Sequence, residues 1–399
     1  MKILQISPQI SFPPDSGGRL SIYGITKSLH ERGHEITFVC YIQESVNEDI
    51  SNELKKICNP IFIKWETKNK ITTAIHNLFS NIPYNISKYY SVKFEEFLVE
   101  YLRQNQVDII HIDHLHMAWA IDLIKKNCNV PVILREHNLE MKIMQRYYGQ
   151  QSNLFLKLYS YIQFKKFLSY EPTICKKFDC CLMVTFEDEK SLLNLNPDIK
   201  TKVIPIGVDE NLFNFKDSNT LPFSLFHIGT LDWQPNFDSL LWFWNEVFPS
   251  IVAKYPNSKL FVYSKGVERL KVPKSLKDNI ILKGYVKDIW EEIKDKQILI
   301  VPLRAGGGMR VKIIEMLAAG QLIVTTSIGK EGIDVVNGQH LLIANSAEEF
   351  TDRIISFFKN EYEKTMFSRN AKELIRAKYT WSKIAEEFEN IYIDLIYKK

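Results

Sequence analysis

A run of glycines, followed by two basic residues and an acid, is the clearest chemical signature in the chain. Residues 301–320 read VPLRAGGGMRVKIIEMLAAG, so an apolar strand-like run leads through Gly306, Gly307 and Gly308 into a helical pattern. Glycines let the backbone approach a ligand closely, and the free N–H groups at a helix N-terminus bind anions. Arg310 and Lys312 fall in the expected first turn, where bases are unfavourable unless an anion lies in front of them.

The acid of this stretch, Glu315, stands about 10 Å beyond Gly308 along a helix that rises roughly 1.5 Å per residue. A carboxylate at this place can accept hydrogen bonds from hydroxyl groups. A ligand with a diphosphate next to sugar hydroxyls would fit both features: the diphosphate would bind the glycines, Arg310 and Lys312, and the hydroxyls would bind Glu315. The alternative is a solvated surface helix whose Arg310 and Lys312 pair with local acids.

Two further glycine turns follow strand-like runs. Gly17 and Gly18 lie in SPQISFPPDSGGRLSIYG, and Gly229 lies in HIGTLDWQPN. Ligands of open α/β sheets bind outside the carboxyl ends of the strands, where these turns would lie. A nicotinamide dinucleotide is disfavoured, because the first strand lacks GxGxxG and the second does not end in an acid.

The elements that must position these residues alternate between strands and helices. This alternation indicates βαβ units, and hence two Rossmann-like, doubly wound α/β domains with parallel sheets. The first strand set comprises residues 2–7, 34–40, 60–64, 107–113, 130–136, 180–185 and 202–206. The second comprises residues 224–230, 259–264, 279–285, 297–303, 321–326 and 340–344.

The polar stretch near residues 207–221 is the expected interdomain linker. It separates an N-terminal domain, 1–207, from a C-terminal domain, 221–381. The final helix, about 382–399, has apolar residues at helical spacing (Ile384, Phe388, Ile391 and Leu395), so one of its faces should pack on a domain.

Composition is that of a globular protein, with 399 residues, 45% hydrophobic, 25% charged and a net charge of +4. This charge is too small to indicate nucleic acid as a partner. Six scattered cysteines form no C-x-x-C pair, and no apolar run approaches the roughly 20 residues of a membrane span. We expect a reduced, cytoplasmic location.

Residues 141–180 carry seven basic residues against two acidic ones, with aromatic residues interleaved. Basic, aromatic helices can lie on anionic membranes, which would place the protein peripherally on the inner face of the membrane. A helix packed on the sheet with a solvated basic edge is the equal alternative.

Five stretches in order give the chain a resemblance to the retaining family 4 of the GT-B glycosyltransferases. They are FPPDSGGRLSIYGITKSLHERGHEITFV, PIGVDENLF, HIGTLDWQPN, PLRAGGGMRVKIIEMLAAGQLIVTTSIGKEGI and YTWSKIAEEFENIY. The resemblance covers nearly the whole chain. It implies a GT-B fold in which the final helix crosses back to the N-terminal domain, and a hexosyltransferase that uses a nucleotide-diphosphate sugar.

The resemblance also assigns roles to the glycine turns. The C-terminal domain is expected to bind the donor, with Glu315 on the ribose hydroxyls and Gly229 in the first glycine loop. Gly17 and Gly18 match the N-terminal glycines near the donor phosphates. The acceptor, a glycan or lipid-linked glycan of surface polysaccharide assembly, is expected on the N-terminal domain.

The chain departs from the family pattern at three places. Gly307 replaces the first glutamate of the E-x7-E motif, so either the backbone of Gly306–Gly308 meets the sugar or the sugar is held differently. The Arg and Lys usual after the domain-2 glycine loop are missing, so Arg310 and Lys312 are expected to supply the charge instead. In DIIHIDHLH, Asp113 stands at the second His of the family's H-x-H.

Histidines at two adjacent strand ends are the candidates for contacts to the sugar or acceptor. His114 follows Asp113, and His137 closes the next strand in LREHNLE. His137 and His114 are the expected contacts, and Asp113 is the alternative.

Retaining transfer in this family is expected to need no enzyme nucleophile, since a nucleoside diphosphate leaves readily once its charge is neutralised. No Asp-x-Asp stands at a strand end, so neither a metal nor another cofactor is expected. Two other functions remain open: a UDP-sugar 2-epimerase of the same architecture, and a non-catalytic sugar-nucleotide-binding partner.

Overall fold

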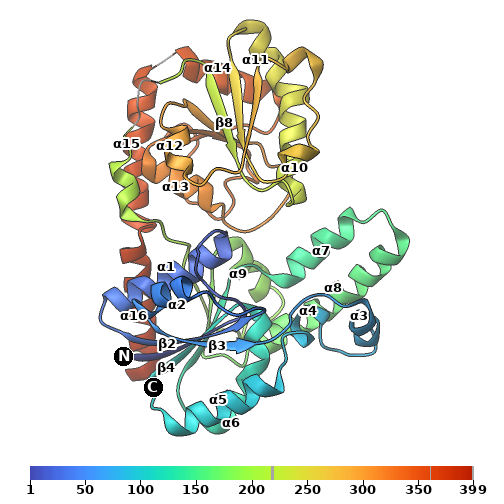
Figure 1. Ribbon diagram of the computed structural model, residues 1–399, viewed down its shortest axis with the longest axis vertical. Coiled ribbons are helices and arrows are strands. Elements are labelled where there is room, and N and C mark those ends of the chain that lie inside the picture. The colour runs from blue at the N-terminus through green and yellow to red at the C-terminus, as the bar shows by residue number, and fades with distance from the viewer. Residues whose placement is uncertain (217–219, 360, 398–399) are drawn as a thin grey trace. The chain divides into compact units, whose positions relative to one another are not determined.

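The computed structural model describes residues 1–216, 220–359 and 361–397, and the chain divides into two compact units (Figure 1). The N-terminal unit comprises Met1–Gly207 together with Trp381–Lys399, and the C-terminal unit comprises Val208–Thr380. Each unit is built on its own parallel sheet. The doubly wound α/β architecture predicted from the sequence is confirmed.

The sheet of the N-terminal unit has seven parallel strands in the order β3-β2-β1-β4-β5-β6-β7. The strands are β1 Lys2–Ser7, β2 Glu35–Ile42, β3 Asn59–Lys64, β4 Ile109–Asp113, β5 Val132–Glu136, β6 Cys180–Met183 and β7 Thr201–Val203. The helices are α1 Gly17–Glu31, α2 Glu48–Lys55, α3 Ile71–Asn77, α4 Tyr84–Ser87, α5 Val92–Gln104, α6 Ile121–Asn127, α7 Glu140–Gln150, α8 Leu154–Cys175, α9 Phe186–Leu193 and α16 Trp381–Tyr397, with a 3-10 turn at Leu115–Ala120.

Apolar side chains cover both faces of this sheet, as the near-continuous apolar strand sequences require. On one face, Leu4 and Ile112 belong to a core shared with α5, α6 and α8. On the other face, Ile3 and Ile109 belong to a core that α1 and α16 complete. The central strands are therefore fully shielded from water.

The last helix, α16, belongs to the core of the N-terminal unit. Its periodic apolar residues Ile384 and Phe388 are fully buried there. The ring of Trp381 lies against two glycines, where a Cβ atom at Gly24 or Gly207 would come within 2.2 Å or 2.5 Å of it. Because glycine has no side chain, the ring can pack between α1, which contains Gly24, and the backbone at Gly207.

The sheet of the C-terminal unit has six parallel strands in the order β10-β9-β8-β11-β12-β13. The strands are β8 Ser224–Ile228, β9 Lys259–Tyr263, β10 Ile280–Gly284, β11 Ile298–Val301, β12 Leu322–Thr325 and β13 Leu342–Ile343. The helices are α10 Gln234–Trp242, α11 Phe248–Lys254, α12 Ile289–Ile293, α13 Val311–Ala319, α14 Ala347–Lys359 and α15 Glu361–Lys378, with a π-helical turn at Phe243–Val247 and 3-10 turns at Glu210–Asn214, Val267–Arg269 and Lys274–Leu276.

Most of the predicted linker is part of the C-terminal unit. Val208 bridges Thr380, and the 3-10 turn Glu210–Asn214 packs on α13. Residues 217–219 of the predicted linker lie outside the described residues. The chain therefore passes between the units at Gly207–Val208 and again at Thr380–Trp381.

Strand order reverses at one place in each sheet. In the N-terminal unit this is between β1 and β4, and in the C-terminal unit between β8 and β11. Loops on either side of such a point diverge and leave a crevice at the carboxyl ends of the strands, where ligands bind in open α/β sheets. Each unit therefore has one place where its candidate residues should gather.

Candidate functional site in each unit

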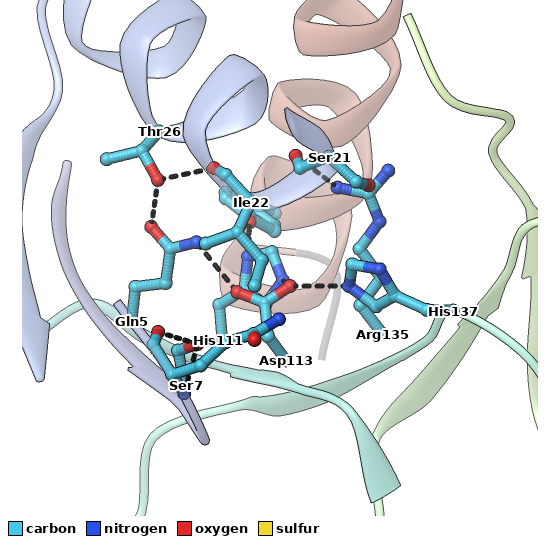
Figure 2. Close-up of polar contacts among 11 residues, drawn as sticks. Gln5, Ser7, Ser21, Ile22, Thr26, His111, Asp113, Arg135 and His137 are labelled. Atoms are coloured by element: carbon cyan, nitrogen blue, oxygen red, sulfur yellow. Dashed lines mark hydrogen bonds and ion pairs between the residues drawn. The ribbon is translucent and has the colours of Figure 1, made fainter. Parts of the chain in front are cut away.

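The polar residues of the N-terminal unit lie near the carboxyl ends of its central strands, on the face that α1 and α16 cover (Figure 2). Residues two apart in a strand share a face, so the apolar Ile109 is followed on this face by His111 and Asp113. Gln5 of β1 is in register with His111, and Arg135 of β5 is in register with Asp113. All four polar side chains are buried.

Asp113 is the centre of this group. Gln5 donates a hydrogen bond of 2.7 Å to its Oδ2, and Thr26 of α1 fixes the Gln5 amide by donating to its Oε1 at 2.8 Å. The Nε2 atoms of His137 and His111 lie 3.1 Å and 3.4 Å from Oδ1. Burial opposes ionisation, but the two histidines outweigh it and hold the pKa of Asp113 well below its usual range.

The His137 ring is fixed by Asp113 and by a second histidine. An ionised carboxylate only accepts hydrogen bonds, so His137 Nε2 carries a proton, and in the neutral ring Nδ1 carries the lone pair. The ring of His114 stacks on it, with centroids 3.8 Å apart and planes at 14°. Burial lowers the pKa of both rings, which favours the neutral form of each.

The far side of the group is closed by α16. The hydroxyl of Tyr392 lies 2.7 Å from Nδ1 of His111, and the ring of Phe388 stacks on the same imidazole. The guanidinium of Arg135 lies 4.9 Å from the Phe388 ring centre and donates to the carbonyl of Ser21. Residues separated by most of the chain thus build one buried polar network.

The paired glycines begin α1 beside the histidines. The helix starts at the exposed Gly17. A Cβ atom at Gly18 would lie 3.3 Å from Gln9 Nε2 and 3.8 Å from His114 Nε2. Gly18 therefore lets the helix N-terminus lie close to the imidazole pair.

In the C-terminal unit, Lys312 joins two of the predicted glycine loops. Its Nζ donates a 2.7 Å hydrogen bond to the carbonyl of Ile228, directly before Gly229. Gly229 has a φ of 155°, and a Cβ atom there would lie 2.7 Å from Asn236 Nδ2 and 3.3 Å from Lys312 Nζ. Asn236 closes the turn by donating to the carbonyl of Thr230 at 2.9 Å.

Arg310 organises the glycine loop that precedes α13. It lies at the N-cap, one residue before the helix begins, and its guanidinium is 5.0 Å from the centre of the Trp233 ring. Its Nη1 donates to the carbonyl of Gly307. Gly306 has a φ of 117°, and a Cβ atom there would come within 2.8 Å of both Arg310 and Trp233. The loop that continues through Gly308 is therefore packed against a cation and an aromatic ring.

Two ionisable groups of α13 have pKa values close to neutrality. Burial, together with neighbouring Arg310, lowers the pKa of Lys312 to about 7. Burial raises the pKa of Glu315 to about 7. The two residues are three apart and share a helix face, with Lys312 at the glycine turn and Glu315 one turn deeper. An anion in the turn would favour the charged form of Lys312.

The structure gathers the predicted residues into two groups, one in each unit. Asp113, His114 and His137 lie together with Gly18, while Gly229, Gly306, Gly307, Arg310 and Lys312 lie together with Glu315 further along α13. His116 is directed elsewhere, with Nε2 3.8 Å from Glu140. Asp113 was predicted as an alternative contact to the sugar, but it is fully buried and orients His137 instead.

Sequence reasoning missed the residues that hold these groups in place. Gln5, His111, Asn236 and Tyr392 were not predicted as site residues. A polar residue inside an apolar strand is a usable signal for Gln5 and His111, because only a partner makes its burial tolerable. No comparable signal marks Tyr392, which lies 281 residues from its partner His111.

Comparison with known proteins assigns the class. Residues 16–212 match the sequence model of the family described as Glycosyltransferase Family 4, and residues 222–360 match that of Glycosyl transferases group 1. The chain is a glycosyltransferase of the GT-B fold and belongs to family 4.

Relatives extend this match over the full length. An uncharacterised 44.6 kDa protein in the cps region of Klebsiella pneumoniae is 24% identical over 96% of this chain and 97% of its own. The fold is similar to sucrose-phosphate synthase from Thermosynechococcus elongatus, with a TM-score of 0.71, 14% identity and full coverage of both chains. It is also similar to Anabaena HepE in complex with UDP and glucose, with a TM-score of 0.65, 13% identity and coverage of 98% and 99%.

Replacing Asp113 by Asn should destabilise the N-terminal unit by about 3 kcal/mol near neutral pH, because the buried donors around it lose their charged acceptor. A carboxyl whose pKa is lowered by folding stabilises the protein above its unfolded pKa, and that contribution disappears as the pH falls. The difference from wild type should therefore shrink below about pH 4. Equilibrium urea denaturation across this pH range measures it.

Asp198→Asn is the matched control, because Asp198 is exposed and pairs with Lys176 on the surface. Its urea midpoint should equal that of wild type. An Asp113→Asn protein as stable as this control would contradict the role given to the buried network.

Proposed function

We propose that the protein is a retaining hexosyltransferase that transfers a sugar from a nucleotide-diphosphate donor to a glycan or lipid-linked glycan in surface polysaccharide synthesis. The observation that carries the donor class is the Lys312 ammonium at the Gly229 turn, with Arg310 and the glycine loop beside it. Backbone N–H groups, an arginine and a lysine together suit a diphosphate. The similarity to HepE, whose structure holds UDP, supports the same class, and the cps-region relative is compatible with the pathway.

The C-terminal unit would carry most of the catalysis by stabilising the leaving group. Arg310 and Lys312 would balance the charge that develops on the departing diphosphate, in a site organised before the substrate arrives. Glu315 would accept hydrogen bonds from the ribose hydroxyls, which orients the donor. Because Gly307 stands where the family has a glutamate, the backbone of Gly306–Gly308 would face the donor sugar.

The N-terminal unit would position the acceptor. His137 is held with a lone pair on Nδ1, which can accept a hydrogen bond from a sugar hydroxyl, and His114 supports its ring from one side. The proton of the reacting hydroxyl would pass to the leaving phosphate oxygen, so no side chain need act as nucleophile. Neither a metal nor another cofactor enters this proposal.

The reaction class can be tested by following both products. A thermal-shift screen of UDP-, GDP- and ADP-sugars identifies the donor, because a ligand of the folded state raises its stability. With that donor and a glycan acceptor, we expect nucleotide release and a new glycoside that keeps the anomeric configuration. Arg310→Ala and Lys312→Ala should each reduce turnover at least about tenfold, the loss expected when one charge-stabilising group is removed.

The alternatives give different products in the same experiment. Conversion of UDP-N-acetylglucosamine to its 2-epimer without acceptor would identify an isomerase instead. Donor binding without nucleotide release under any acceptor condition would identify a binding partner.

The pH dependence of donor binding should separate Lys312 from Glu315. Above pH 7 free Lys312 is mostly neutral, so binding a diphosphate must take up a proton and weakens as the pH rises. Glu315 ionises over the same range and then accepts hydrogen bonds better. UDP-glucose affinity between pH 6 and 9 should therefore fall in Glu315→Gln, by up to about tenfold per pH unit, and rise in Lys312→Met.

Isothermal titration calorimetry provides this measurement, and Lys254→Met, which removes an exposed lysine of α11, should behave as wild type. Parallel pH profiles in the two α13 variants would contradict the assigned roles.

We also propose that the protein works at the inner face of the membrane. The structure describes no helix long and apolar enough to span a bilayer. Helices α7 and α8 form a hairpin, and the start of α8 carries Leu154 and Phe155, which are 80% and 86% exposed (Figure 1). Beside α8, the α3 region carries Ile71 and Phe79, which are 81% and 92% exposed. Exposed apolar residues of this size mark a surface that binds a partner.

The basic charge of residues 141–180 is less available than the sequence suggested. Lys142, Lys176 and Lys177 pair with acidic residues elsewhere in the unit. Lys157, by contrast, lies over the half-buried ring of Tyr148, near the apolar residues that begin α8. The proposed membrane surface is therefore the apolar start of α8 with Lys157, not the whole basic segment.

Sedimentation with vesicles tests this surface. The wild type should sediment with vesicles that contain anionic lipid, and the double variant Leu154→Asp, Phe155→Asp should lose at least about tenfold in partitioning, because the apolar area no longer enters the interface. Leu195→Asp, at another exposed apolar position of the same unit, is the control. Equal sedimentation of the two variants would refute the proposal.

A further inference from the structure

The N-terminal unit contains a pocket of about 630 Å³ at the carboxyl ends of β1, β2 and β3. Its walls include Gln9 and Arg19 from the β1–α1 region, Tyr41 and Gln43 from the end of β2, and Trp65 beyond β3, with Tyr89 beside them. The volume is that of a small-molecule site, and its place at the strand ends is where α/β sheets bind ligands.

Three aromatic rings form one wall of this pocket. The centroids of Tyr41 and Trp65 are 6.5 Å apart and those of Tyr41 and Tyr89 are 6.4 Å apart, with both pairs of planes at 35°. The Tyr41 hydroxyl donates to the Tyr89 carbonyl at 2.7 Å, and Trp65 Nε1 donates to the Lys88 carbonyl at 2.9 Å. Because backbone carbonyls accept hydrogen bonds from Tyr41 and Trp65, these two rings are held in place before any ligand arrives.

Amide side chains provide hydrogen-bonding groups around the aromatic wall. Gln9 and Gln43 can each donate and accept, which matches hydroxyl groups that do both. Gln43 makes a long 3.4 Å contact to Thr67. Arg19 pairs with Asp15 at 3.2 Å, and Glu44 also lines the pocket, so the site has no excess of positive charge. Aromatic rings beside amides, without strong charge, suit the polar and apolar faces of a pyranose ring.

The pocket borders the imidazole pair. Gln9 lies next to His114 across Gly18, with both side chains within 4 Å of the position that a Cβ atom at Gly18 would take. Tyr89 contacts the same histidine loop from the other end, since its ring is 4.8 Å from that of His116. A sugar in the pocket would thus lie next to the loop that carries His114, against which His137 stacks.

We propose that this pocket binds the terminal pyranose of the acceptor, stacked on Trp65, which the buried Tyr41 ring supports, and hydrogen-bonded by Gln9 and Gln43, with one hydroxyl directed to the His114–His137 pair. This proposal rests on the proposed function and names the acceptor class and the residues that select it. The acceptor would then be a glycan whose terminal sugar binds in this pocket. The protein would recognise that sugar and not only a lipid to which the glycan is attached.

Saturation-transfer NMR without nucleotide tests the pocket independently of turnover. Glucose, galactose, N-acetylglucosamine and glucuronic acid are the probes, and at least one pyranose should give signals with the wild type. Gln43→Ala and Trp65→Leu should each lower the affinity for the sugar at least about fivefold. Stacking on an aromatic ring and a hydrogen bond to an amide each contribute about 1 kcal/mol or more. Trp65→Phe should restore part of the affinity.

Tyr147→Ala, which removes an exposed aromatic ring of α7 outside the pocket, is the control and should bind as wild type. UDP-glucose should still raise the melting temperature of every variant, which separates failure of the pocket from failure of donor binding. The proposal is overturned if no pyranose binds, if Gln43→Ala and Trp65→Leu bind like the control, or if uridine displaces the sugar.

Discussion

The arrangement of the N-terminal unit depends on one buried carboxylate. Asp113 has no access to water, so its ionised form exists only while protein groups replace the solvent. Those groups come from β1, from β4 itself, from the end of β5 and, through His111, from α16. Each partner is held by a further contact, such as Thr26 on Gln5 and Tyr392 on His111. The orientation of His137 is the chemical result.

The same constraint explains why the polar and apolar residues are divided along the strands. At the amino ends Ile3 and Ile109 pack against α1 and α16, whereas two residues later Gln5 and His111 replace them on the same face. The sheet thus keeps a dry core at one end and a polar network at the other. The apolar residues that stabilise the unit and the polar residues that orient His137 therefore occupy different positions on the same face of the sheet.

Much of this architecture was predictable, because apolar runs separated by helical patterns are local features. All thirteen predicted strands are present, although β11 ends at Val301 where the prediction continued to 303. The glycine turns and the bases at α13 were also found from local sequence. What was missed is the direction of side chains: Lys312 bonds the Ile228 carbonyl, and Tyr392 meets His111, through tertiary contacts that no local pattern encodes.

The packing of the Trp381 ring against Gly24 and Gly207 has a consequence for biosynthesis. Residues 1–207 leave the ribosome before the C-terminal unit, yet the helix that covers their second apolar face begins only at Trp381. Until then Ile3 and Ile109 lack the cover of α16, and His111 lacks Tyr392. The unit made first is therefore completed last, and during synthesis of the C-terminal unit it carries an open apolar face of the kind that chaperones recognise.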